Sequence, residues 1–172
     1  DVSVPKTAKA MEQGGACALS VLTEPFYFQG SLENMRMAKD ATRLPVMRKD
    51  FIIDSYQLYE ARHYGADAVL LMVSVLGDAT KDFYKKTKEL GMEALVEVHD
   101  EGEIKAALAS GAEIIGINNR NLTDLSIDLK TTERLSKLIP KDKILVSESG
   151  IKDKKDLDFV LKYADAALVG TS

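Results

Sequence analysis

The sequence predicts an α/β protein, namely a barrel-type fold in which seven parallel strands alternate with helices. Three observations predict it: a helix–turn–strand unit recurs along the chain, polar residues end several strands, and glycine-containing turns follow the last two strands. Strands that alternate with helices pair in parallel. A closed barrel gathers their carboxyl ends at one mouth, whereas a doubly wound sheet spreads them along an edge.

The recurring unit is an amphipathic helix, a pair of small residues, an apolar strand and then polar residues. Its copies cover residues 15–21, 65–71, 91–96, 111–116 and 163–168. The strands at 45–49 and 143–147 lack the small pair but have the same apolar character. The glycines fall where the end of a helix needs a left-handed residue. These segments give seven strands.

Helix starts are predicted where a short polar residue precedes an amphipathic stretch, because its oxygen or charge stabilises the free N–H groups of the first turn. The predicted starts are Ser31, Asp54 with Ser55, Asp78, Asp100, Asp128 and Asp153. An opening helix over residues 4–13 has Pro5 in its first turn, where proline is tolerated.

Composition and charge predict one soluble domain over residues 1–172, with 45% hydrophobic and 29% charged residues. The net charge of −4 and the pI of about 5.3 disfavour nucleic acid and anionic membranes as partners. No apolar run could span a bilayer, and no signal peptide is visible. The single cysteine, Cys17, excludes an internal disulfide, so we expect a cytoplasmic protein. Because Cys17 lies in an apolar run, we expect a buried structural thiol.

Four polar residues each end a predicted strand, one step past an apolar residue on the same face: Lys49, Glu97, Asn118 and Glu148. A lysine can donate a proton to a carbonyl, a glutamate can accept one or stabilise a cation, and an asparagine can orient a hydroxyl. Each residue alone is typical of a solvated strand end. The four together favour a catalytic site at a barrel mouth.

Residues near these strand ends complete a candidate binding site. Arg120 can hold a carboxylate through two parallel hydrogen bonds. Apolar groups could line a pocket the size of an aromatic ring, with ordinary rim packing as the alternative; they are Phe28, Phe51, Leu70 and Leu122.

The turns after the last two predicted strands suit a phosphate group. Glycine after a strand lets backbone N–H groups approach a ligand, and hydroxyls add donors. The residues concerned are Ser149, Gly150, Gly170 and Thr171. The alternative is a pair of ordinary strand-to-helix turns.

Other titratable residues give weaker patterns. His63, late in a helix, is typical of a surface residue favoured by the helix dipole. His99 shares the strand parity of Glu97, so a position at the mouth is its less favoured interpretation. We expect no metal site and no dinucleotide or nucleotide loop, because no ligand cluster, Gly-rich fingerprint or Walker pattern occurs.

Several long motifs resemble the indole-3-glycerol-phosphate synthase family, in family order and over nearly the whole chain. They are residues 18–25, 27–31, 48–54, 95–99, 115–122 and 147–151. The resemblance implies a (β/α)8 barrel of tryptophan biosynthesis, a carboxy-lyase that needs no cofactor. Its substrate would be the phosphorylated small molecule 1-(2-carboxyphenylamino)-1-deoxyribulose 5-phosphate, which closes an indole ring with loss of carbon dioxide and water.

The resemblance also implies roles for the candidate residues. Lys49 would be the general acid and Glu97 the general base, while Asn118 and Glu148 hold the ring-closing geometry and Arg120 lies near the substrate carboxylate. The four residues of the two turns would bind phosphate, and the four apolar residues would surround the anthranilate ring.

The chain departs from the family pattern at its ends. A first strand with Glu-x-Lys, the following Ser-Pro-Ser segment and a last barrel helix are absent. The resemblance therefore implies an incomplete (β/α)8 barrel whose seven parallel strands run from the barrel's first helix to its eighth strand, and we expect such a truncated form to have little or no activity. One alternative is a non-catalytic phosphate-binding barrel fragment that self-associates through its open strand edges. A sister barrel such as phosphoribosylanthranilate isomerase is disfavoured, because it uses a cysteine at a strand's carboxyl end and Cys17 lies at a strand's start.

Overall fold

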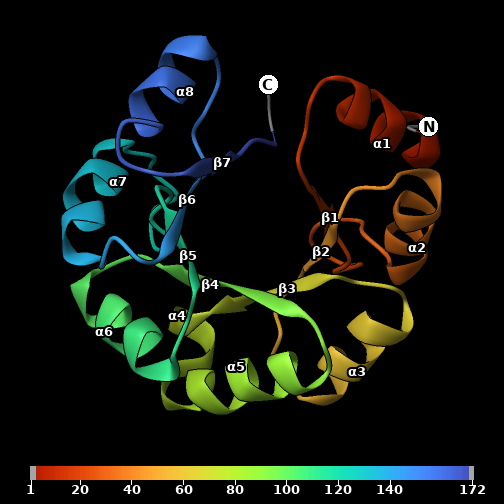
Figure 1. Ribbon diagram of the computed structural model, residues 1–172, viewed down its shortest axis with the longest axis horizontal. Coiled ribbons are helices and arrows are strands. Elements are labelled where there is room, and N and C mark those ends of the chain that lie inside the picture. The colour runs from red at the N-terminus through yellow and green to blue at the C-terminus, as the bar shows by residue number, and fades with distance from the viewer. Residues whose placement is uncertain (1–2, 171–172) are drawn as a thin grey trace. The chain divides into compact units, whose positions relative to one another are not determined.

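The structure, a computed structural model, describes residues 3–170, which divide into two compact units (Figure 1). The first unit comprises the chain up to Leu71 together with Lys85–Ala94. The second comprises Met72–Tyr84 together with the chain from Leu95 onward. The prediction of one domain over the whole chain stays a prediction.

The first unit is a parallel sheet with helices between its strands. Its elements are α1 (Val4–Gln13), β1 (Leu19–Leu22), α2 (Leu32–Ala41), β2 (Val46–Lys49), α3 (Tyr56–His63) and most of β3 (Ala68–Met72). Leu19 lies opposite Val46, and Met47 lies opposite Ala68. The N–H of Glu93, which opens β4, donates to the carbonyl of Asp67 at 2.9 Å, so β4 starts beside β3.

The second unit continues the same alternation. It holds α4 (Val73–Leu76), the 3-10 turn η1 (Gly77–Ala79), the first part of α5 (Thr80–Glu89), most of β4 (Glu93–Val98), α6 (Glu101–Ser110), β5 (Ile114–Asn118), α7 (Lys130–Leu135), the 3-10 turn η2 (Ser136–Leu138), β6 (Ile144–Glu148), α8 (Lys154–Val160) and β7 (Ala166–Leu168). The pairs β4–β5, β5–β6 and β6–β7 are parallel. Buried Ile115, Ile117 and Leu135 lie between β5 and α7.

Within each unit, the strands are neighbours in chain order and the helices cover one face of the sheet (Figure 1). A doubly wound sheet would instead carry helices on both faces. Parallel strands in chain order with all helices outside are the arrangement of a (β/α)8 barrel. The predicted fold class, an incomplete barrel of seven parallel strands, is therefore confirmed for the described residues.

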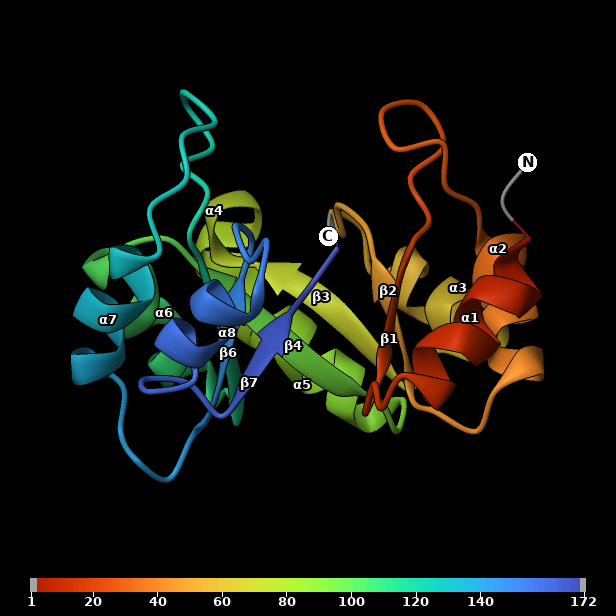
Figure 2. The same ribbon diagram turned by 90° about the horizontal axis from the view of Figure 1, so that it is seen from above.

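Two loops project beyond the carboxyl ends of their strands, one after β1 and one after β5 (Figure 2). In the loop after β1, the Glu24 carboxylate accepts backbone N–H groups of Phe26, Tyr27 and Phe28. In the loop after β5, the N–H of Asn121 donates to the carbonyl of Ser126 at 2.8 Å. Local hydrogen bonds thus give both loops a defined conformation.

Several predicted helix starts are confirmed by side-chain caps. Ser31 accepts the N–H of Asn34, Asp100 accepts that of Glu103, and Asp153 accepts those of Lys155 and Asp156. Two starts lie elsewhere, because Asp78 falls in η1 and Asp128 lies two residues before α7. The short helix α4 was not predicted.

Two sequence-based predictions about single residues are wrong. Cys17 is exposed, because β1 begins only at Leu19 and Cys17 lies in the turn before it. Leu70 lies in the middle of β3 and is 2% exposed, so it belongs to the core rather than to a strand end.

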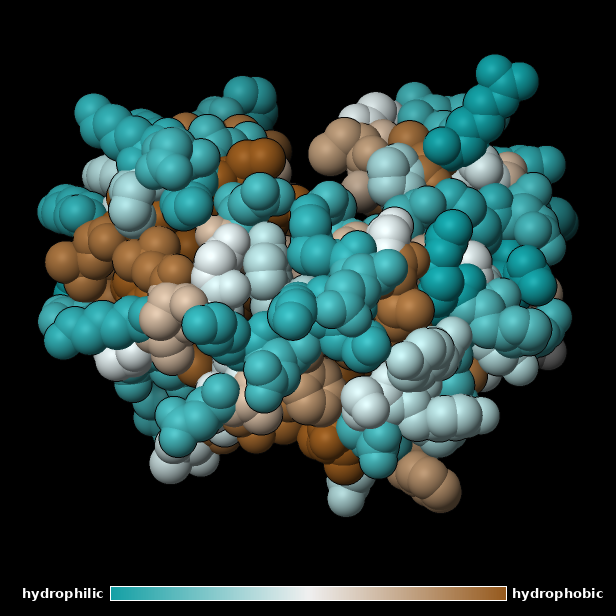
Figure 3. All heavy atoms as spheres, turned by 60° about the horizontal axis from the view of Figure 1, so that its bottom comes forward, coloured by the Kyte–Doolittle hydropathy of each residue, from teal (hydrophilic) through white to brown (hydrophobic). Residues whose placement is uncertain are grey.

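The outer surface shown in Figure 3 is mainly hydrophilic, with hydrophobic side chains in small separate groups. Among the described residues, no helix is both long and apolar enough to cross a membrane.

Candidate functional site

Three predicted polar residues come together at the carboxyl ends of three adjacent strands in the second unit. Glu97 lies opposite Gly116, and Asn118 lies opposite Glu148. Side chains at paired positions, and two residues further along, point to the same face of a sheet. Glu97 and Glu148 are each 1% exposed and Asn118 is 8% exposed. Two carboxylates and an amide therefore share one largely dry face.

Gly116 makes room for the Glu148 carboxylate. A Cβ atom at Gly116 would collide with Oε1 of Glu148 and would lie 3.2 Å from Cδ1 of Leu95. The Glu148 carboxylate thus folds over the backbone of β5, next to the strand that carries Glu97. Glycine is needed here for space and not for its backbone angles.

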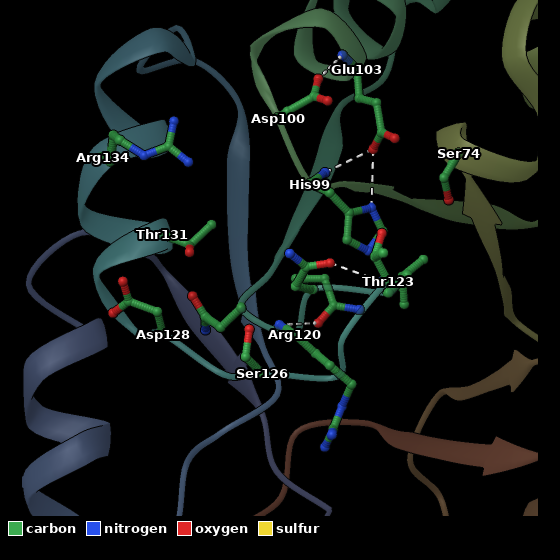
Figure 4. Close-up of a pocket in the computed structure, with 14 residues that line it drawn as sticks. Ser74, His99, Asp100, Glu103, Arg120, Thr123, Ser126, Asp128, Thr131 and Arg134 are labelled. Atoms are coloured by element: carbon green, nitrogen blue, oxygen red, sulfur yellow. Dashed lines mark hydrogen bonds and ion pairs between the residues drawn. The ribbon is translucent and has the colours of Figure 1, made fainter.

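His99 lies just after β4, between the carboxylates of Glu97 and Glu103, and Figure 4 shows its contact with Glu103. Its Nε2 is 3.3 Å from Oε1 of Glu97, and its Nδ1 is 3.0 Å from Oε2 of Glu103. Its backbone N–H also donates to Glu103 at 2.8 Å. Burial of the ring lowers the pKa of His99, but the hydrogen bond to Glu103 and the charges of Glu97, Glu103 and Asp100 outweigh it. The pKa of His99 therefore lies above its ordinary value.

A polar cavity of about 490 Å³ opens beside these residues (Figure 4). It is lined by Ser74, His99, Asp100, Glu103, Asn118, Asn119, Arg120, Asn121, Leu122, Thr123, Ser126, Asp128, Thr131 and Arg134. Oδ1 of Asn118 accepts the backbone N–H of Arg120 at 3.0 Å, which orients the amide. The Arg120 guanidinium contacts the Leu125 carbonyl at 3.4 Å, and Leu122 is 46% exposed. Arg120 and Leu122, two of the five residues predicted to bind substrate, thus line the cavity.

The turn after β6, which holds two of the predicted phosphate-binding residues, has two consecutive residues with left-handed backbone angles. Ser149 has φ 66° and Gly150 has φ 88°, and both values lie in the left-handed region. A side chain at Gly150 would collide with Ile127. Gly170 follows β7, the strand beside β6, and Thr171 lies outside the described residues.

Asn119 anchors this turn from behind. Its Nδ2 contacts Oγ of Ser147 and the carbonyls of Glu148 and Ser149 at 3.0–3.1 Å. Its Oδ1 accepts the N–H and the hydroxyl of Thr132 at 3.1 and 2.8 Å. Asn119 is 2% exposed, and Ser147 and Thr132 are fully buried. The network joins β5, β6 and α7 directly beneath the turn.

The first unit holds the other predicted residues. Lys49 ends β2 and is half-buried, on the face of the strand that carries Met47. The rings of Phe28 and Phe51 stack with centroids 5.8 Å apart. The predicted aromatic pair is therefore in contact, whereas Leu70 lies inside β3.

A buried ionic cluster holds the residues on both sides of Lys49. Arg48 lies 3.0 Å from Asp50 and 3.3 Å from Glu60, and it donates to the carbonyl of Gln57 at 2.7 Å. Thr23 donates its hydroxyl to Asp50 at 2.6 Å. Side-chain exposures of 4% for Arg48 and 7% for Asp50 show how far the pair is desolvated.

Sequence reasoning missed these supporting residues. Arg48 and Ser147 are polar residues inside otherwise apolar strands, on the face opposite the predicted site. That break in an apolar run was the available signal. Asn119 lay within a recognised motif, but its position just after β5 gave no indication of which strands it would join. For His99, a position at the mouth was the less favoured interpretation of the sequence.

Comparison with known proteins identifies the family. The family model for indole-3-glycerol phosphate synthase matches residues 1–172. The chain belongs to the indole-3-glycerol phosphate synthase family. The synthase of Methanocaldococcus jannaschii is 53% identical over 169 residues, which are 98% of this chain and 63% of that protein. The synthase of Endomicrobium trichonymphae is 51% identical over 99% of this chain and 67% of that protein. The chain thus spans about two thirds of the length of these family members.

Solved structures support the fold assignment. An N-acetylmannosamine-6-phosphate 2-epimerase from Clostridium perfringens has a TM-score of 0.73 at 16% identity, covering 95% of this chain and 76% of that chain. A native KDPGal structure has a TM-score of 0.73 at 14% identity, covering 98% of this chain and 78% of that chain. At these identities, the likeness concerns the fold alone.

Replacing Gly116 should disturb Glu148. We expect Gly116→Ala to lower the free energy of unfolding by about 2 kcal/mol, because the new methyl group overlaps the buried carboxylate. Chemical denaturation measures this loss. Gly102→Ala, inside α6, is the control and should cost less, because its methyl group would meet only Oδ1 of the Asp100 side chain, at 3.2 Å, and not a buried carboxylate in direct overlap. A Gly116→Ala protein as stable as the parent would contradict the packing described.

Removing the Asn119 side chain should lower the free energy of unfolding more than removing the side chain of an exposed neighbour. We expect Asn119→Ala to lower the free energy of unfolding by roughly 3 kcal/mol, because buried groups of Thr132 and Ser147 lose their partners. Asn121→Ala, in the exposed part of the same loop, should change it by less than about 1 kcal/mol. Equal losses in urea titrations would rule out a special role for the network.

Breaking the cluster next to Lys49 should also destabilise the protein. Arg48→Met leaves Asp50 desolvated without its cation, and we expect a loss of about 3 kcal/mol. The double variant Arg48→Met with Asp50→Asn should lose less than the single one, which a thermodynamic cycle measures. Additive losses would show that the two residues do not interact.

Proposed function

We propose that the chain carries most of the catalytic and phosphate-binding residues of an indole-3-glycerol phosphate synthase. The reaction converts 1-(2-carboxyphenylamino)-1-deoxyribulose 5-phosphate to indole-3-glycerol phosphate with loss of carbon dioxide and water. Family membership supports this proposal, and so does one observation above all. Glu97, Asn118 and Glu148 are buried side by side at adjacent strand ends, next to a turn with left-handed backbone angles.

Acid–base chemistry is assigned to the charged residues. Lys49 acts as the general acid at the ribulose carbonyl, because an ammonium group donates a proton readily to a carbonyl oxygen that gains negative charge. Glu97 acts as the general base in the dehydration step. Its near-complete burial supports this role, because water is excluded from the proton transfer. No cofactor is required for this chemistry.

Asn118 and Glu148 hold the geometry of ring closure. The backbone N–H of Arg120 orients the Asn118 amide, and Gly116 leaves the space that the Glu148 carboxylate occupies. Groups fixed before the substrate binds lose little entropy in the reaction, which is the physical basis of their contribution.

Binding of the substrate is assigned to groups around these residues. Ser149 and Gly150 bind the phosphate through backbone N–H groups and a hydroxyl, together with Gly170 and Thr171. Arg120 binds the carboxylate of the anthranilate moiety. The anthranilate ring is assigned to Phe28, Phe51 and Leu122, of which Phe28 and Phe51 already stack on each other.

The 172-residue chain by itself is proposed to have little or no turnover, and the protein to act in the cytoplasm. A second candidate function is that of a phosphate-binding fragment that self-associates. One observation favours it: within the described residues, β1 pairs with β2 and β7 with β6, so each presents an open edge.

Calorimetry with indole-3-glycerol phosphate tests the proposed site. We expect the chain to bind it, and Ser149→Ala to weaken binding about tenfold through loss of a hydrogen bond to a charged group. Ser55→Ala, an exposed serine that makes no capping hydrogen bond, is the control. Absence of binding, or equal affinity of the Ser149→Ala protein, would contradict the phosphate assignment.

A turnover assay tests the proposed loss of activity. The rate of the 172-residue chain is compared with that of the complete Methanocaldococcus jannaschii synthase under the same conditions. We expect a rate lower by at least about 10³, the typical loss when one acid–base group is missing. A comparable rate would refute the proposal that this chain is inactive alone.

A further inference from the structure

Two side chains next to Glu97, those of His99 and Glu103, have no role in the proposed reaction. Glu97, His99 and Glu103 form a line of two carboxylates with an imidazole between them. Glu103 is held in turn, because its backbone N–H donates to the Asp100 side chain at 2.9 Å and its carboxylate accepts the N–H of His99. The ring of His99 is therefore fixed from the side of α6.

Nε2 of His99 and Oε1 of Glu97 are both buried and have no hydrogen-bond partner among the described residues, so their 3.3 Å approach is an ion-pair contact rather than a hydrogen bond. A carboxylate only accepts hydrogen bonds, so Nδ1 of His99 must carry a proton to bond Glu103. In a neutral imidazole, Nε2 would then present a lone pair to Oε1 of Glu97 at 3.3 Å, and two acceptors would face each other. A proton on Nε2 removes this conflict and places a cation beside the buried carboxylate.

We propose that His99 is a positioning residue that keeps the Glu97 carboxylate ionised and oriented, and that Glu103 holds the His99 ring for this purpose. The functional meaning rests on the proposed role of Glu97 as general base. A carboxylate that is ionised and held in place is ready to accept a proton. The raised pKa of His99 agrees with this arrangement.

Other charges face the same region. Glu97 comes from β4, Asp100 and Glu103 come from the start of α6, and Arg120, Asp128 and Arg134 line the cavity from the segment after β5 and from α7. Glu148 lies on the same sheet face as Glu97. Acidic groups lie closest to the imidazole, so the surrounding field favours its cationic form.

The sign of the effect on stability follows from the raised pKa. A histidine whose pKa is higher in the folded than in the unfolded protein stabilises the fold fully below the unfolded pKa, about 6.5. That contribution is lost as the pH rises through the folded value. The stability difference between the native chain and His99→Gln should therefore be larger at pH 6 than at pH 9.

Nuclear magnetic resonance of the 172-residue chain tests the proposal without substrate. The chain has only two histidines, so His63, exposed at the end of α3, serves as the internal reference. With labelled histidine, we expect Glu97→Gln and Glu103→Gln each to lower the titration midpoint of His99 by about one pH unit and to leave that of His63 in place. An unchanged His99 midpoint in a folded Glu97→Gln protein would overturn the proposal.

The reciprocal measurement separates positioning from a merely structural contact. With labelled glutamate carboxyls, His99→Gln should move the Glu97 carboxyl resonance at pH 7 toward the position of a protonated carboxyl, because the cation beside it is lost. Glutamine can still donate a hydrogen bond but carries no charge, so a packing role alone would leave the resonance at the position of a carboxylate and refute the proposal. Should Glu97→Gln fail to fold, this variant still decides the question.

Failure of this proposal and failure of the proposed function have different signatures. Coupled titration of His99 and Glu97 without any affinity for indole-3-glycerol phosphate would reject the function and keep the pairing. Affinity for that ligand with independent titrations would keep the proposed function and reject the pairing of His99 with Glu97.

Discussion

Burial of two carboxylates on one face of a sheet is the constraint on which the second unit depends. Glu97 and Glu148 are almost fully removed from water at adjacent strand ends. Desolvating a charge costs several kcal/mol unless nearby groups compensate. The titratable ring of His99 lies against Glu97. Because Gly116 has no side chain, the Glu148 carboxylate can lie against the backbone of β5. Burial of charged groups at such a cost in free energy is typical of functional sites.

The opposite face of the same strands carries hydrogen bonds that hold the backbone near the two carboxylates in place. Asn119 connects Ser147, Thr132 and the carbonyls of the turn after β6, so an unusual backbone conformation at Ser149 is held by buried hydrogen bonds. The first unit follows the same principle, because the Arg48–Asp50 pair fixes the residues on both sides of Lys49. In each unit, polar groups on the opposite face of the strands hold the segments that carry that unit's predicted residues.

The sequence predicted the fold and much of the site for identifiable reasons. Alternating apolar strands and capped helices determine which segments are parallel strands, and strand parity gives the face on which Glu97, Asn118 and Glu148 lie. The motifs identified the family. Three-dimensional neighbours could not be predicted in this way, because the contacts of Asn119 join residues up to 30 positions apart and the space above Gly116 depends on the rotamer of Glu148. Cys17 shows the limit at element ends, since an apolar run extended three residues beyond the strand that it predicted.

A crystal structure of the chain with indole-3-glycerol phosphate bound would test the central claim most directly. The account predicts the phosphate against the backbone N–H groups of Ser149 and Gly150, and the indole ring over the face that carries Glu97, Asn118 and Glu148. A ligand bound elsewhere, or a Glu148 side chain turned away from Gly116 toward the helices, would contradict it.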